Sequence, residues 1–252
     1  MGPPGSRKTT LGLQFPDVHI MDCDRNLDGP SDFLCKGMNG IKPLIPNLSF
    51  TWDDIRKTES GEEREVDDCF DELINRLKEF KTNKDYQARK TVFVDSLSHV
   101  NEFIIRKVLK VQDKTRKNYV MEARDWTPFK SFAYSLLVGR LEETGKTIIC
   151  SCHEITLTES AGQGEDMMKQ RVVGVEPFFQ GKVGDTIGAF FTDVWRMTIR
   201  HATGGKTETW LQTIPPITNP KCEHLKNSLG MPSELNITEG YKALEPYLRN
   251  KI

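Results

Sequence analysis

Residues 1–10 read Met1-Gly-Pro-Pro-Gly-Ser-Arg-Lys-Thr-Thr10, and this stretch decides the fold class. Gly2, Lys8 and Thr9 match the phosphate-binding pattern G-x-x-x-x-G-K-[ST], and Arg7 stands where the pattern has its second glycine. In such a loop, backbone N–H groups surround the β- and γ-phosphates of a nucleotide, the lysine neutralises them, and the threonine hydroxyl binds Mg²⁺. The stretch therefore predicts ATP contacts from Gly2, Pro3, Pro4, Gly5, Ser6, Arg7, Lys8, Thr9 and Thr10.

The composition is that of a soluble globular protein. The 252 residues suffice for one large α/β domain, predicted over 1–252, and the net charge of −1 excludes a global basic field for nucleic acid. No apolar run approaches the roughly 20 residues that a membrane helix needs, so we expect no membrane contact. Six scattered cysteines indicate reduced thiols and a cytoplasmic location.

Apolar strand signals alternate with helical ones along the chain. Strands are predicted at 18–22, 91–95 and 147–152, and helices at 66–80, 100–111 and 128–143. Strands near 193–200 and 207–213, joined by a Gly-containing turn, predict an antiparallel hairpin. We therefore expect a three-layer α/β core whose sheet is mainly parallel, with the hairpin at one edge.

Two further segments lie outside this alternation, and one expected strand is absent from it. The polar, Gly-containing segment Thr156–Val173 is interpreted as a mobile loop, and residues 233–252 as a peripheral helical tail. A phosphate loop normally follows a buried strand, yet only Met1 precedes Gly2. We therefore expect that the first strand of the fold is missing from the chain and that Met1 is not the true start.

Polar residues follow three of the predicted strands. Asp95 ends an apolar strand, where a carboxylate can hold the Mg²⁺ water shell opposite Thr9; the alternative is an ordinary Asp turn. Asp24 follows the first strand and could orient the attacking water, or belong to a solvated turn. His153 could sense the γ-phosphate, or be a structural histidine at a strand end.

Together these residues resemble the RecA-like P-loop ATPases, especially the compact phage type associated with single-strand annealing and recombination. The resemblance covers Gly2 to about Leu235 and depends on the order and spacing of its motifs. The matching stretches are Gly2–Thr10, Ile20–Asp28, Thr91–Ser96, Gly145–Glu154, Phe190–Arg196 and Trp210–Pro215.

The resemblance implies a role for each matching position. The catalytic carboxylate falls on Asp24, the Walker B aspartate on Asp95 and the γ-phosphate sensor on His153. The loop after the sensor strand usually contacts DNA, which makes Lys169 and Arg171 the candidate DNA-binding residues. The alternative is that both are solvated charges, because acidic residues share their loop.

The sequence also departs from the family pattern. Arg7 replaces a glycine, which implies a strained loop or an added phosphate-facing guanidinium. Asp24 is often glutamate in relatives. Related hexameric ATPases carry a Lys-x-Arg pair that reaches the neighbour's nucleotide, and of this pair only the lysine matches, at Lys221.

The predicted activity is ATP binding and hydrolysis with Mg²⁺, coupled to single-stranded DNA in phage recombination, annealing or repair. The implied partners are single-stranded DNA, a single-strand-binding protein and further copies of the chain in a ring or filament. The implied location is the host cytoplasm. Two alternatives remain open: a DnaB-like helicase motor, and a scaffold that binds nucleotide and DNA without hydrolysis.

Overall fold

The computed structural model describes residues 1–23, 69–112, 121–160, 170–215 and 224–248. These residues divide into two compact units, one formed by Thr9–Ser151 and the other by Met1–Lys8 with the chain from Cys152 onward. The prediction of one domain over 1–252 stays a prediction. No helix among the described residues is long and apolar enough to cross a membrane.

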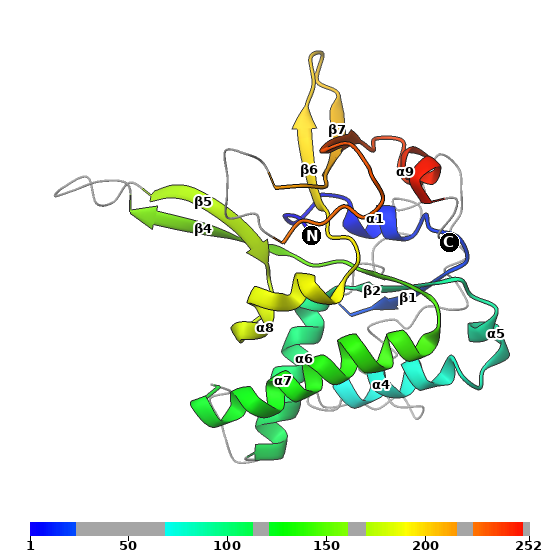
Figure 1. Ribbon diagram of the computed structural model, residues 1–252, viewed down its shortest axis with the longest axis vertical. Coiled ribbons are helices and arrows are strands. Elements are labelled where there is room, and N and C mark those ends of the chain that lie inside the picture. The colour runs from blue at the N-terminus through cyan, green and yellow to red at the C-terminus, as the bar shows by residue number, and fades with distance from the viewer. Residues whose placement is uncertain (24–68, 113–120, 161–169, 216–223, 249–252) are drawn as a thin grey trace. The chain divides into compact units, whose positions relative to one another are not determined.

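The unit of Thr9–Ser151 contains a parallel sheet in the order β1-β2-β3. Its strands are β1 (Val18–Asp22), β2 (Thr91–Asp95) and β3 (Thr147–Cys150), which confirms the three predicted strand positions. Its helical segments are α1 (Lys8–Gly12), α4 (Cys69–Glu79), α5 (Lys84–Gln87), α6 (Leu97–Gln112), η2 (Ala123–Asp125), α7 (Trp126–Tyr134), η3 (Ser135–Arg140) and η4 (Glu142–Thr144). Figure 1 shows α1 on one side of β1 and β2, and α4, α6 and α7 on the other.

Strand alternation explains how both faces of this sheet are covered. Ile20 and Phe93 are register partners and pack with Leu13, which directly follows α1. The neighbouring residue His19 points to the opposite face, where its ring contacts Phe80 after α4. Because side chains alternate along a strand, Asp95 lies on the Phe93 face, which is the α1 side of the sheet.

The second unit contains two antiparallel sheets. Its strands are β4 (Glu154–Ser160), β5 (Gln170–Pro177), β6 (Arg196–His201), β7 (Thr207–Gln212) and β8 (Glu234–Asn236). Its helices are α8 (Gly181–Thr186), η6 (Ile187–Phe190) and α9 (Tyr241–Leu248). The β6–β7 hairpin confirms the predicted turn, in which Gly204 and Gly205 have φ of 83° and 76°.

Two fold predictions are wrong. The β6–β7 hairpin is not an edge of the parallel sheet: among the described residues it forms a separate sheet with β8. The segment Thr156–Val173 is not a loop throughout, because both of its described ends, 156–160 and 170–173, belong to the paired strands β4 and β5. Threonine and valine favour strands, and a register shift at Leu157/Thr158 interrupts the alternation that would have identified β4.

The C-terminal tail is only partly helical. It begins with β8, which pairs with β7, and ends in α9, where Leu244 and Leu248 are buried. The backbone of Glu234–Asn236 pairs with β7. Three residues are too few to show a strand pattern in the sequence.

Candidate functional site

The phosphate loop turns through two residues with positive φ. Gly5 has φ of 76° and Arg7 has φ of 66°. Glycine reaches this left-handed region freely, whereas for other residues it costs about 1–2 kcal/mol. The backbone is therefore left-handed at the position where the family pattern has glycine. Because this residue is Arg7, the conformation carries that free-energy cost.

The Arg7 guanidinium reaches β7. Its Nη1 donates a hydrogen bond to Oγ1 of Thr209 at 3.3 Å, over a sequence separation of 202 residues. Of the two possibilities considered for Arg7, the structure therefore supports the strained loop, and it places the guanidinium on a threonine of the β6–β7–β8 sheet.

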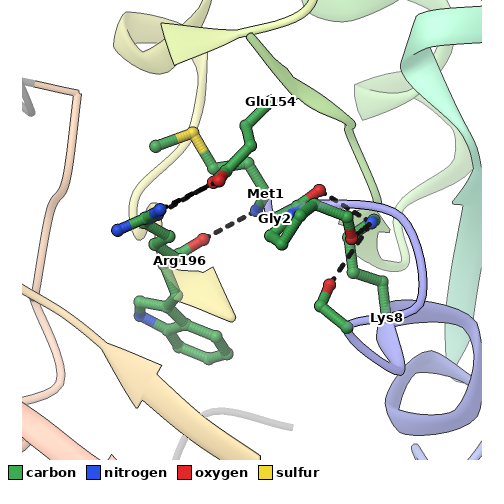
Figure 2. Close-up of polar contacts among 8 residues, drawn as sticks. Met1, Gly2, Lys8, Glu154 and Arg196 are labelled. Carbon is green, nitrogen blue, oxygen red and sulfur yellow. Dashed lines mark hydrogen bonds and ion pairs between the residues drawn. The ribbon is translucent and has the colours of Figure 1, made fainter. Parts of the chain in front are cut away.

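Lys8 is held by the loop that it follows. Its Nζ donates to the carbonyl oxygens of Gly2 at 2.8 Å and Pro3 at 2.9 Å, and to Oγ of Ser6 at 3.4 Å (Figure 2). Ser6 is buried and its backbone N–H donates to Pro3 O at 3.2 Å, which closes the turn. The ammonium thus lies against the loop backbone, where a nucleotide phosphate would bring the charge that it complements.

Met1 and Gly2 take the place of a strand. Gly2 forms a parallel bridge with His153, and its N–H donates to Cys152 O at 3.2 Å. On the other side, Met197 N donates to Met1 O at 2.8 Å. A Cβ on Gly2 would lie 2.6 Å from Met197 O, so this position requires glycine.

An ion pair joins the strands on either side of this segment (Figure 2). Arg196 of β6 donates from Nε and Nη2 to the Glu154 carboxylate of β4, at 2.8 Å and 2.9 Å. The Met1 amine donates to Trp195 O at 2.7 Å, and burial lowers the pKa of this amine to about 6. The sequence pattern does not predict this pairing of Glu154 with Arg196.

The Thr9 hydroxyl meets the carboxylate of Asp95. Thr9 Oγ1 donates to Asp95 Oδ2 at 2.5 Å, and Ser151 Oγ donates to Asp95 Oδ1. Asp95 is buried, and its main-chain carbonyl accepts from Cys23 N at 2.6 Å, which brings the end of β1 alongside. The two residues predicted to hold the metal are therefore in direct contact.

The donor set fits a magnesium nucleotide. A threonine hydroxyl and a carboxylate are hard oxygen ligands of the kind that Mg²⁺ selects, and the metal usually retains several waters beside them. Thr9 and Asp95 would hold the metal, and Lys8 and the N–H groups of the loop would hold the phosphates. Thr10 follows within α1.

The other predicted site residues lie in several places. His153 bridges to Gly2 at the start of the second unit, as described above. Asp24 and Lys169 lie outside the described residues. Arg171 belongs to β5, where it is the register partner of Glu159. Pro4 lies in the exposed turn of the phosphate loop.

The sequence did not identify Ser151 as a site residue. The sequence feature that could have identified Ser151 is a polar residue directly after an apolar strand. The position of Ser151 beside Asp95 follows from the parallel register. Val94 pairs with Cys150, so the next residue of each strand brings Asp95 beside Ser151. That register is set by tertiary pairing, which the sequence of either strand does not specify.

The parallel sheet, the phosphate loop and the Thr9–Asp95 contact define a P-loop nucleotide-binding protein. A family model described as the AAA domain matches residues 1–221. The chain therefore belongs to the AAA domain family, as a P-loop ATPase domain. A search of curated proteins finds no match.

Proposed function

We propose that this chain is a RecA-like ATPase of the compact phage type, which couples Mg²⁺·ATP binding and hydrolysis to single-stranded DNA. The observation that carries the ATPase part is the 2.5 Å contact between Thr9 Oγ1 and Asp95 Oδ2, because it places the threonine hydroxyl of the motif at the end of β2. The order of the motifs supports the RecA-like subtype, and with it a role in recombination, annealing or repair.

The roles of the individual residues follow from their chemistry. Bound Mg²⁺ would neutralise charge that develops on the phosphate oxygens. Lys8 binds the phosphates, and Thr9 and Asp95 hold the metal and its water shell. Asp24 orients the attacking water and accepts its proton. His153 contacts the γ-phosphate and passes its loss to the β4–β5 hairpin that begins at the next residue.

ATP turnover by wild type and by Lys8→Ala tests the ATPase assignment. Lys8→Ala should lose hydrolysis and most ATP affinity, because the phosphates lose their neutralising charge. Lys90→Ala is the matched control. Lys90 is exposed, and its Nζ lies 3.8 Å from Asp17 Oδ2, a surface ion pair that contributes little to stability. Wild-type protein that binds Mg²⁺·ATP without hydrolysing it would instead support the scaffold, for which the left-handed Arg7 is the supporting observation.

Single-stranded DNA is the proposed partner, bound through Lys169 and Arg171. Phosphate contacts make binding salt-dependent, with a slope of about −0.7 per contact for single strands. Replacing both residues by alanine should weaken binding and reduce the slope by about 1.4, with little change in basal ATP hydrolysis. A Lys182→Ala/Lys206→Ala control removes the same charge from α8 and the β6–β7 turn.

Fluorescence anisotropy of a labelled oligonucleotide at several salt concentrations measures both quantities. Equal slopes in the two double variants would move the DNA site away from this hairpin. Duplex unwinding in place of strand annealing would favour the helicase motor. Sedimentation with ATP and DNA tests the proposed ring or filament, and pull-down of a single-strand-binding protein tests that partner.

A further inference from the structure

Asp95 has a second hydroxyl partner besides Thr9. Thr9 donates to Oδ2 and Ser151 donates to Oδ1, so each carboxylate oxygen accepts a bond from a different element. Ser151 is buried with 4% of its surface exposed, and Asp95 with 1%. Water is therefore largely excluded from both groups.

The backbone fixes where the Ser151 hydroxyl lies. Ser151 N donates to Val94 O at 3.0 Å, and Leu97 N donates to Ser151 O at 2.9 Å. These bonds extend the parallel ladder of β2 and β3 one residue beyond β3. Because side chains alternate along a strand, Ser151 shares the face of Ile149, and Asp95 shares the face of Phe93.

From this geometry we propose that Ser151 is a positioning residue for the metal site, which holds the Asp95 carboxylate in the orientation that directs Oδ2 to Thr9. A carboxylate can rotate about its Cβ–Cγ bond, and its terminal torsion is broad. A donor on Oδ1 restricts that rotation. The inference rests on the proposed binding of Mg²⁺·ATP.

Ser151 acts through Asp95, to which its hydroxyl donates, and is not proposed as a ligand of metal or phosphate. Removing its hydroxyl leaves Oδ1 buried without that donor, which favours other carboxylate orientations. Residues that orient metal ligands typically change metal affinity by 10–100-fold when they are replaced. Phosphate binding by Lys8 and the loop does not involve this bond, so the effect should be confined to the metal.

The test measures equilibrium binding of a fluorescent ATP analogue with Mg²⁺ and with EDTA, together with the Mg²⁺ concentration for half-maximal binding. Ser151→Ala should raise that concentration about tenfold and leave binding in EDTA unchanged. Ser151→Thr keeps the hydroxyl and should restore wild-type behaviour. Ser151→Cys has a weak donor of similar shape, so its Mg²⁺ concentration for half-maximal binding should lie between those of wild type and Ser151→Ala. If Ser151→Ala does not fold, Ser151→Cys takes its place in the test.

Thr91→Val is the matched control. Thr91 is buried at the opposite end of β2, and its hydroxyl donates to Pro16 O at 2.9 Å. This variant removes a buried hydroxyl bond from the same strand, away from the metal site, and should leave the Mg²⁺ dependence unchanged.

The outcomes separate the inference from the proposed function. Ser151→Ala with wild-type Mg²⁺ dependence, or with an equal loss in Mg²⁺ and EDTA, would overturn the positioning role alone. An equal rise in the required Mg²⁺ concentration in Thr91→Val would also overturn the positioning role, because the defect would then come from a general loss of stability. Wild-type protein without Mg²⁺-dependent ATP binding would overturn the proposed function and this inference with it.

Discussion

Gly12 and Phe93 lie so close that α1 can pack on β2 only because residue 12 has no side chain. A Cβ on Gly12 would lie 2.3 Å from the Phe93 ring, which is buried, so the ring or the helix would have to shift. Gly12 ends the helix that carries Lys8 and Thr9. The close approach therefore helps set the position of Thr9 against the sheet.

Gly12→Ala should destabilise the protein by about 1–3 kcal/mol, because the added methyl group overpacks the contact with Phe93. Urea unfolding followed by circular dichroism measures the change. Gly139→Ala is the control: it lies in the helical segment η3 with open space around its Cβ position, and should be neutral or slightly stabilising. A smaller ring partner, Phe93→Leu, should recover part of the loss when combined with Gly12→Ala.

Arg7→Gly should be more stable than Arg7→Ala by about 1 kcal/mol, because only glycine adopts φ of 66° without strain. Both variants lose the hydrogen bond to Thr209, so their difference isolates the backbone. Thr209→Val removes the same bond and leaves Arg7 in place. Thermal or urea unfolding measures the stability of the three variants. Equal stability of Arg7→Gly and Arg7→Ala would contradict a strained loop.

Protonation of His19 should make the protein acid-sensitive. The ring is buried against Phe80 and Tyr86, and within the described residues neither ring nitrogen has a hydrogen-bond partner. Burial, reinforced by the positive charges of Arg89 and Arg76, lowers the pKa of His19 from 6.5 to about 4. The unfolded chain therefore binds the proton more readily than the folded one between these values.

The sign of the effect follows from this difference. The contribution of neutral His19 to the free energy of unfolding is fully present above pH 6.5. It is lost as the pH falls toward about 4, and the total loss is up to about 3 kcal/mol. Urea unfolding at a series of pH values measures the slope, and His19→Leu should flatten it. A His19→Leu variant with the wild-type slope would assign the acid sensitivity to other groups.

Asp24→Asn should bind Mg²⁺·ATP like wild type and lose at least about 100-fold in turnover, because a water-orienting base acts on the chemical step. Single-turnover hydrolysis and equilibrium nucleotide binding separate the two effects. Asp28→Asn replaces another carboxylate of the same stretch and serves as the control. Equal turnover in Asp24→Asn and wild type would remove Asp24 from the mechanism.

Local patterns in the sequence predicted several elements correctly. The apolar runs at 18–22, 91–95 and 147–152 predicted β1, β2 and β3, because short apolar runs are typical of the strands of a parallel sheet covered on both faces. The β4–β5 hairpin was missed because its register shift and its threonines weaken the period of two. The phosphate-loop pattern identified the nucleotide-binding class, since its spacing is a property of the chain alone.

The sequence by itself determined the positions of β1, β2, β3 and the β6–β7 hairpin, the phosphate loop and the acidic strand ends, because each depends on neighbouring residues. Only the tertiary structure decided which distant groups meet: Ser151 with Asp95, Arg7 with Thr209 and Glu154 with Arg196. It also decided that β6, β7 and β8 form their own sheet. Such contacts depend on strand register and on the packing of remote segments, and these are settled by the free energy of the whole fold.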